Sequence, residues 1–227
     1  MKNLWILLFT GIICISSYGQ IFVDKYNMGD IDGSSWATAY TAVDDALRFA
    51  KEGEEIWIAK GVYTVPWHLE SFVVDKSLTI YGGFLGDEES PEERHLNKFT
   101  TVLSGDRNRD DIPTDLVGNK SDNATHIMII KTDDNPVIIN GITFQGGMAA
   151  FGADFGDEQG QGGAVLGHGR MIFEHCQFDN NTATFGGAVY IIPSDIPTRF
   201  MHCTFETNYA EQFGGGIYAD DPYSNII

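Results

Sequence analysis

The chain has 227 residues, with 32 acidic side chains against 14 basic ones and a formal net charge of −18 at pH 7. An excess of negative charge this large repels the phosphates of nucleic acids and anionic lipids, so nucleic acid is excluded as an expected partner. After removal of a leader, about 208 residues are left, which is enough for one domain with its own hydrophobic core.

The N-terminal segment 1–19 has the pattern of a secretory signal peptide. Lys2 precedes an apolar run from Leu4 to Ile15, and Ser17 and Gly19 supply small residues where a signal peptidase cuts. We therefore expect a secreted chain. The rest of the sequence has no other apolar run long enough for a transmembrane helix.

The start of the mature chain, about 20–55, is predicted to form an N-terminal cap with one short helix. Thr41 and Asp44 have the spacing of a capping box, and Gly53 is placed to end the helix. One face of this helix is apolar and consists of Val43, Ala46, Leu47 and Ala50. We expect this face to cover the first coil of the domain and protect its edge. Docking of the helix on a partner protein is the alternative.

Short runs of alternating apolar residues follow, which predict β-strands. They lie at Glu55–Ala59, Leu78–Phe84, Thr101–Ser104, His126–Lys131 and Val137–Phe144. At ~25 to 30 residues per coil, the mature chain has room for about seven coils, of which those over about 56–136 are degenerate. The long charged segments 85–99 and 105–123 are expected to be loops that project from one side, where a local function would lie.

The second of these segments contains an acidic pattern that suggests calcium. Asp106, Asn108, Asp110 and Asp111 offer oxygen ligands at the spacing with which an EF-hand loop begins. The likeness ends there, because Asp111 stands where the sharp-turn glycine belongs and Val117 where the bidentate glutamate belongs. Calcium is the one cofactor that the sequence suggests, and a solvated acidic loop without metal is the alternative.

The last part of the chain, about 137–220, repeats two short phrases in a fixed order. Glycine pairs recur at intervals of 24 and then 28 residues, from position 162 to 186 and from 186 to 214. A phrase of the form Phe-x-x-Asn recurs in step with them. The positions that carry the two phrases, and that we expect to be structural, are Phe178, Asn181, Gly186, Gly187, Phe205, Asn208, Gly214 and Gly215.

Repeats of this length with short strands and no helical period cannot bury their apolar side alone, so successive copies must stack on a shared core. The sequence therefore predicts an all-β fold, a right-handed parallel β-helix. Paired glycines permit positive φ angles and close approach of the coils. Asn181 and Asn208 are expected to take left-handed corners and to hydrogen-bond along their column.

Alternation also predicts which repeat side chains face inward. Phe173, Cys176 and Phe178 fall near one face, and Phe200, Cys203 and Phe205 repeat the arrangement 27 residues later, from position 173 to 200. The columns of the cysteines and of the later phenylalanines start at Ile142 and Phe144. Since both cysteines lie in apolar columns, we expect buried thiols rather than a disulfide, although neighbouring parallel strands would permit a bridge.

The paired phrases Phe-x-x-Asn and Gly-Gly-Ala resemble the repeat of polymorphic outer membrane proteins. The resemblance covers about residues 137–220, although Gly216 and Gly147 depart from the pattern. It implies a secreted β-helix that is displayed at the surface of a Gram-negative bacterium and acts in adhesion. This family has no catalytic residues to carry over.

The upstream residues Asp32-Gly33-Ser34-Ser35-Trp36 and Gly61-Val62-Tyr63 are similar to the opening of β-helix proteins related to the pectate-lyase superfamily. That resemblance implies enzyme chemistry as an alternative. Gly167-His168-Gly169-Arg170 resembles one of the short motifs of polygalacturonases, so His168 and Arg170 are the candidate catalytic residues. The paired carboxylates that hydrolysis requires do not accompany this motif.

The first hypothesis for function is therefore non-catalytic recognition or adhesion, with a polysaccharide or a cell-surface glycan or protein as the partner. The aromatic residues that would stack on sugar rings if exposed are Trp36, Trp57, Tyr63 and Trp67. A calcium-dependent polysaccharide lyase or glycosidase is the alternative. Because Ser224 to Ile227 begin what resembles another strand, we expect the chain to be truncated there, and a structural stalk for a missing C-terminal module is the third hypothesis.

Overall fold

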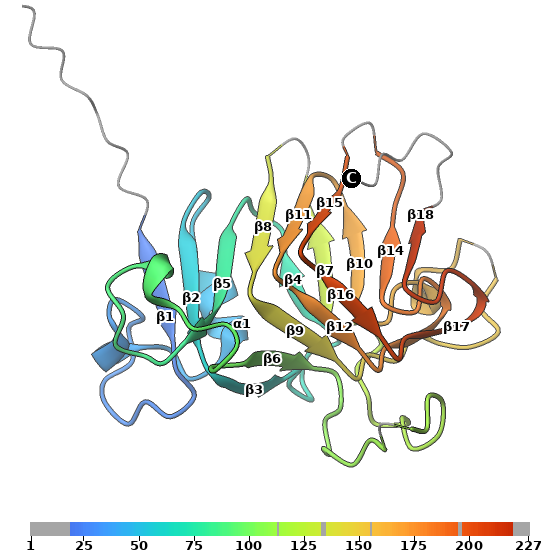
Figure 1. The fold of residues 1–227 in the computed structure, drawn as a ribbon, viewed down its shortest axis with the longest axis horizontal. Helices are drawn as coiled ribbons and strands as arrows, with labels where there is room; N and C mark the ends of the chain where they lie inside the picture. The colour runs from blue at the N-terminus through green and yellow to red at the C-terminus, as the bar shows by residue number, and fades with distance from the viewer. Residues whose placement is uncertain (1–18, 113, 133–134, 155, 195–196, 220–227) are drawn as a thin grey trace, which may run out of the picture.

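Short parallel strands follow one another around a common core and stack into sheets in this computed structural model, which describes residues 19–112, 114–132, 135–154, 156–194 and 197–219 (Figure 1). The fold is a parallel β-helix, and the predicted all-β solenoid is confirmed. Residues 1–18 of the predicted signal peptide and the expected strand at Ser224 lie outside the described residues. No helix among the described residues is long and apolar enough to span a bilayer.

Three sheets form the long walls of the solenoid. The first sheet contains β1 (Gln20–Val23), β2 (Glu55–Ala59), β5 (Thr79–Phe84), β8 (Val137–Asn140), β11 (Met171–Glu174) and β15 (Arg199–Met201). The second contains β3 (Gly61–Thr64), β6 (Thr101–Ser104), β9 (Ile142–Gln145), β12 (Gln177–Asp179) and β16 (Thr204–Glu206). The third contains β4 (Phe72–Val74), β7 (Met128–Lys131), β10 (Val165–His168), β14 (Val189–Ile191) and β18 (Ile217–Ala219). A short fourth sheet pairs β13 (Thr182–Phe185) with β17 (Tyr209–Phe213).

Each coil takes one strand from each long sheet in turn. The chain passes through β2, β3 and β4, then β5, β6 and β7, and continues in this order to β15, β16 and β18. In the described part of the chain this gives β1 and five further coils, fewer than the seven predicted. The difference arises because segments 85–99 and 105–123 lengthen their coils with loops instead of adding new ones.

Most of the predicted strands are present, and one is divided. The strands at Glu55–Ala59 and Thr101–Ser104 have the predicted bounds. The run predicted as a single strand from 137 to 144 is split into β8 and β9, because Gly141 between them has a φ of 75° and turns the chain into the next sheet.

The predicted cap helix exists, but its start was predicted wrongly. Helix α1 runs from Val43 to Phe49, with Ala42 at the N-cap and no side-chain cap, so Thr41 and Asp44 form no capping box. It ends at Phe49, ahead of Gly53. The apolar face is buried as predicted and packs against β1, β2 and β4 at the first coil. Three short 3-10 helices lie in loops: η1 (Trp36–Thr38), η2 (Pro91–Glu93) and η3 (Glu158–Gly160).

Like residues stack inside the repeat coils. The rings of Phe144, Phe178 and Phe205 are nearly parallel, with centroid distances of 5.1 and 4.7 Å. Phe173 and Phe200 form a second stack at 5.1 Å. Phe144, Phe173 and Phe178 are fully buried, which confirms that these columns face inward.

The two cysteines occupy neighbouring inward positions as free thiols, with Cys176 buried and Cys203 only partly buried. Burial raises the pKa of the Cys176 thiol. The pKa of the Cys203 thiol is lowered, because Cys203 forms a hydrogen bond with Cys176. The prediction of two thiols agrees with this arrangement, although Cys203 is less buried than expected.

The corners of the repeats differ from the prediction in one respect. Asn181 and Asn208 do form a column, in which the Asn181 amide donates to Asn208 Oδ1 at 3.0 Å. Neither of them has a positive φ. The left-handed residues are one position earlier, Asn180 and Thr207, with φ values of 54° and 51°. The left-handed turn is therefore completed before the ladder residue, whose side chain is then free to point along the stack.

Candidate functional site

The loop 105–123 projects from one side of the solenoid, as predicted (Figure 1), but its base is fixed to the coils. Asp106 is 9% exposed, and its carboxylate accepts hydrogen bonds from the backbone N–H groups of Arg109, Asp110 and Asp111 at 2.6, 3.2 and 3.1 Å. Backbone donors thus hold this carboxylate in place. Asn108 is exposed.

A buried ion pair completes the attachment of this loop. Lys120 Nζ lies 2.9 Å from Asp111 Oδ2, and the two side chains are 1% and 8% exposed. Lys120 also donates to the carbonyl of Asn180 at 3.1 Å. Burial raises the pKa of Asp111, and the Lys120 ammonium opposes that shift. The sequence prediction identified Asp111 but missed Lys120, because a lone lysine in a charged loop gives no signal of burial.

The candidate catalytic residues lie apart from such a network. His168 ends β10, where it is paired in register with Lys131, and Arg170 follows Gly169 at the turn into β11. Among the described residues, no ion pair joins either side chain to a carboxylate. Their catalytic role stays a prediction.

The aromatic residues considered for sugar stacking divide into two groups. Trp57 and Tyr63 are buried, so they cannot stack on a ligand. Trp36 is partly covered and donates its indole N–H to the carbonyl of Glu88 at 2.9 Å. Trp67 is 66% exposed, with the Arg107 guanidinium 5.0 Å from its ring centroid. Of the four residues, Trp67 is the one whose ring is largely open to solvent.

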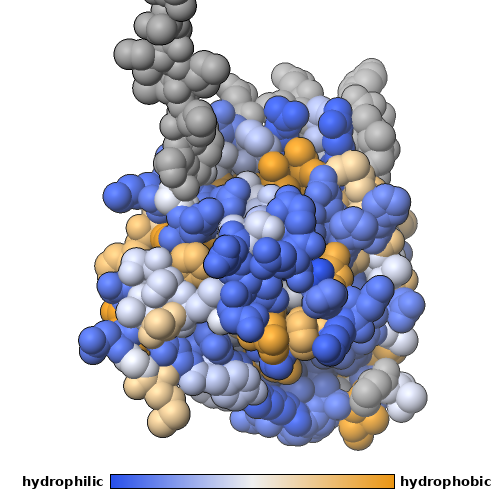
Figure 2. All heavy atoms as spheres, turned by 60° about the vertical axis from the view of Figure 1, so that its left-hand side comes forward, coloured by the Kyte–Doolittle hydropathy of each residue, from blue (hydrophilic) through white to orange (hydrophobic). Residues whose placement is uncertain are grey.

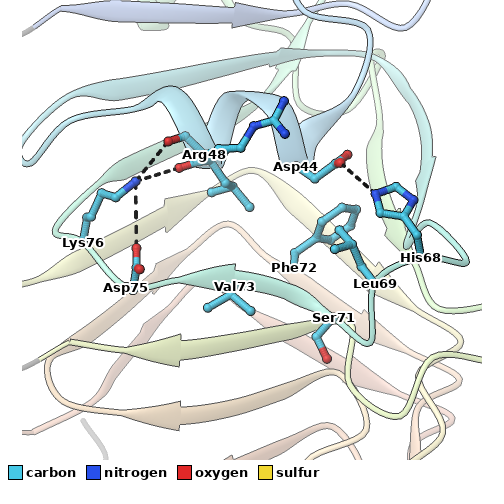
Figure 3. Close-up of a pocket in the computed structure, with 10 residues that line it drawn as sticks. Asp44, Arg48, His68, Leu69, Ser71, Phe72, Val73, Asp75 and Lys76 are labelled. Atoms are coloured by element: carbon cyan, nitrogen blue, oxygen red, sulfur yellow. Dashed lines mark hydrogen bonds and ion pairs between the residues drawn. The ribbon is translucent and has the colours of Figure 1, made fainter.

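A pocket of about 420 Å³ lies between α1 and β4 at the first coil (Figure 3). Its charged groups are engaged with one another and with the helix. Lys76 donates to the carbonyls of Leu47 and Ala50 at 3.0 and 3.1 Å, which satisfies the C-terminal end of α1. His68 Nε2 lies 3.7 Å from Asp44 Oδ2, a contact that is drawn as a dashed line in Figure 3. These contacts hold the cap helix on the coil. The face of the molecule in Figure 2, on which the left-hand side of Figure 1 comes forward, is mainly hydrophilic.

A second hollow of about 430 Å³ runs along the corner between the first and second sheets. Three corner residues from successive coils line it: Gly141, His175 and His202. All three have positive φ, and the two imidazole rings are stacked at a centroid distance of 4.9 Å. The end of the loop 85–99 forms one side of the hollow through Leu96 and Asn97. We call this hollow the corner groove.

Several polar side chains of the corner groove have no hydrogen-bond or ion-pair partner among the described residues. Thr143, Gln177 and Thr204 are aligned across β9, β12 and β16 and line the groove. Among the described residues, none of these three side chains and neither imidazole forms a hydrogen bond or an ion pair. The groove therefore presents hydroxyl, amide and imidazole groups that a ligand can engage.

This groove was only partly foreseen from the sequence. The loop 85–99 was predicted to carry function, but no role was predicted for His175 and His202. A signal was present: each histidine follows an alternating strand, precedes a cysteine, and aligns with Gly141 in the earlier coil. A residue aligned with a corner glycine lies at a corner, where its side chain is exposed.

The fold and these columns define a β-helix protein whose last coils are tandem repeats. Comparison with known families then identifies the repeat itself. Residues 175–192 and 202–220 match the family model of the Chlamydia polymorphic membrane protein repeat. The resemblance inferred from the sequence is thus confirmed over these two segments, which begin at His175 and at His202. No curated protein and no solved structure matches the chain.

Proposed function

We propose that this protein is a cell-surface recognition protein and that it binds a neutral glycan in the corner groove. The location rests on the matched repeat, whose family is described as a membrane protein of Chlamydia. The binding mode rests on one observation: a row of uncommitted hydroxyl, amide and imidazole groups runs across three successive coils. Sugar hydroxyls are both donors and acceptors, and such side chains complement them.

The shape and charge of the groove favour this class of ligand. A volume of about 430 Å³ lies within the range of small-molecule sites, and the parallel coils repeat the same groups along the groove. No residue that lines the groove is acidic or basic apart from the two histidines. With a net charge of −18 on the whole chain, uronate-rich polymers are repelled, so a neutral chain is the expected ligand.

A glycan array tests the binding proposal. Gln177→Ala removes the central amide of the groove, and we expect the affinity for the bound glycans to fall about fivefold to tenfold. Gln159→Ala, which changes an exposed glutamine in η3, is the matched control and should bind as the wild type does. Equal retention by both variants would remove the groove from the proposal.

The same array distinguishes recognition from turnover. A lyase or glycosidase releases unsaturated ends or reducing sugar from its ligand, whereas a recognition protein leaves it intact. Release that depends on His168 or Arg170 would establish the enzymatic alternative. Binding of acidic glycans alone would contradict the charge argument.

Surface display is tested separately. Protease added to intact cells that produce the full-length protein should cleave it, while a periplasmic marker protein stays whole. Protection of the protein on intact cells would contradict a cell-surface location.

A further inference from the structure

Three aspartates of the loop 105–123 form a compact cluster. One carboxylate oxygen from each of Asp106, Asp110 and Asp111 lies within 4.8 Å of the others. Asp106 and the Asp111 side chain are largely buried, whereas Asp110 is exposed and opens the cluster to solvent. Three like charges at this separation repel one another strongly unless something compensates them.

The charges around this cluster do not balance. Lys120 is the one described cation that forms an ion pair with it, so three carboxylates face one ammonium group. The backbone donors to Asp106 relieve that carboxylate in part. Asp110 receives no hydrogen bond and no ion pair on its carboxylate from any described residue. Buried charges in folded proteins are usually paired or bound to metal. Here Lys120 leaves two negative charges without a cation, one of them on the largely buried Asp106 and the other on the exposed Asp110.

A second, independent feature points to a missing ligand. Three buried side-chain oxygens have no hydrogen-bond partner in the structure: Asp111 Oδ1, Asn123 Oδ1 and Asn180 Oδ1. Asn123 and Asn180 are 8% and 3% exposed. Their amide nitrogens reach Asp111 Oδ2 at 3.0 and 3.4 Å, so both amide groups adjoin the cluster. An unsatisfied buried oxygen is costly, and Asp111 Oδ1 belongs to the cluster itself, where an electropositive ligand would satisfy it.

We infer that a divalent cation of the calcium type binds at Asp106, Asp110 and Asp111, where it satisfies the buried and unpartnered Asp111 Oδ1. The donors are carboxylate oxygens without sulfur or imidazole, which is the ligand chemistry of calcium rather than of zinc or copper. The cation neutralises the two unpaired charges. Asn180, whose amide donates to Asp111 Oδ2, lies in the matched repeat, so a cation that fixes Asp111 also holds the loop 105–123 on the repeat coils.

Calorimetric titration of the full chain with calcium chloride tests this inference, with sodium chloride at equal ionic strength as the blank. We expect one binding site, and a Tm that rises by about 5 °C at saturation relative to protein in chelator. Asp110→Asn is the diagnostic variant, because its carboxylate takes no part in the hydrogen bonds that fold the loop. Its affinity for calcium should fall at least about tenfold.

Asp87→Asn is the matched control, since it removes one negative charge from an exposed position in the other long loop. It should bind calcium as the wild type does. If Asp110→Asn and Asp87→Asn behave alike, the cation is held only by the diffuse charge of the chain and the inference is overturned. Absence of any calcium-specific heat and Tm shift in the wild type overturns it as well, and buried water then fills the site. Calcium binding is independent of the glycan proposal, because neither readout uses a glycan.

Discussion

The early coils and the repeat coils bury their aromatic residues in different ways. In the early part, Trp57 alternates with the core residues Ile56 and Ile58 and so lies on the outer face of the first sheet, where it stacks on Phe84 at 4.9 Å. Loops that carry Trp36 cover it. In the repeats, like residues stack inside the solenoid. A second buried cluster of Leu166, Phe185 and Tyr190 covers part of the third sheet, whereas the second sheet stays open at Gln177 and Thr204.

This difference explains where a ligand can bind. A coil whose outer face is covered by loops buries more apolar surface, but that face is then closed to a ligand. This is the arrangement at the cap and over the first sheet. A coil stabilised by an internal ladder needs no cover, so Thr143, Gln177 and Thr204 remain available on its outer face. The repeat sequence thus supports the core with inward residues and leaves its outward positions to function.

The largest effect is expected from breaking the phenylalanine ladder. Phe178→Ala removes a fully buried ring between Phe144 and Phe205, and the free energy of unfolding should fall by about 4 kcal/mol. Phe205→Ala, in the last described coil, removes a partly exposed ring and should cost less than half of that. Urea denaturation of the two variants checks the order, and equal losses would show that the ladder is not the main support of the repeats.

A glycine of the repeat phrase should give the next largest effect. Gly186 has a φ of 64°, and an added Cβ would lie 2.4 Å from the carbonyl oxygen of Val189. Gly186→Ala should therefore cost about 3 kcal/mol in the free energy of unfolding. Gly152→Ala isolates the backbone contribution, since Gly152 has a φ of 68° but no atom within 4 Å of the added carbon. Its cost should be about 1 kcal/mol. Thermal unfolding measures both, and equal costs would refute the steric contribution of the contact between Gly186 and Val189.

The third largest effect is expected from the column of Asn181 and Asn208. Asn181 is fully buried, accepts the N–H of Gly147 at 3.0 Å and donates to the carbonyl of Phe144 at 3.0 Å. Asn181→Ala leaves these two backbone groups unsatisfied and should cost about 2 kcal/mol. Asn208→Ala, at the partly exposed end of the column, should cost about 1 kcal/mol. A neutral effect of Asn181→Ala in urea denaturation would contradict the role given to this column.

The smallest effect concerns pH and a buried histidine of the early coils. His126 is 3% exposed, and its Nδ1 lies 2.9 Å from the carbonyl oxygen of Gly162. Burial lowers the pKa of His126 below its ordinary value of 6.5. As the pH falls from 6.5 toward the lowered folded-state pKa, the His126 imidazole is protonated in the unfolded chain but stays neutral in the folded chain. The stability that His126 contributes is therefore present above that window and is lost within it.

Between pH 7.5 and 5.5, the free energy of unfolding of His126→Gln should fall less than that of the wild type. We expect the two decreases to differ by about 1 kcal/mol. Urea denaturation at both values measures it. His95→Gln, at an exposed position, should keep the wild-type pH dependence. If all three proteins respond alike, carboxylates elsewhere dominate and His126 does not couple folding to pH.

The sequence was informative where a pattern repeats and uninformative where contacts are unique. The inward columns of Phe178 and Phe205 followed from alternation and from the period of the repeat, because stacked copies must align. The burial of Lys120 depends on a single fold-back of one loop onto the coil of Asn180, which no local pattern encodes. The corner groove is intermediate. The positions of its histidines can be predicted from the repeat, but the proximity of Leu96 to them cannot.

Titration with the glycan that the array identifies gives the most direct test of the account, using three proteins: wild type, Gln177→Ala in the corner groove, and His68→Ala in the pocket between α1 and β4. The account predicts that Gln177→Ala weakens binding about fivefold or more, while His68→Ala binds like the wild type. The reverse order would place the ligand at the cap helix and would contradict the claim that the uncovered face of the repeats is the recognition surface.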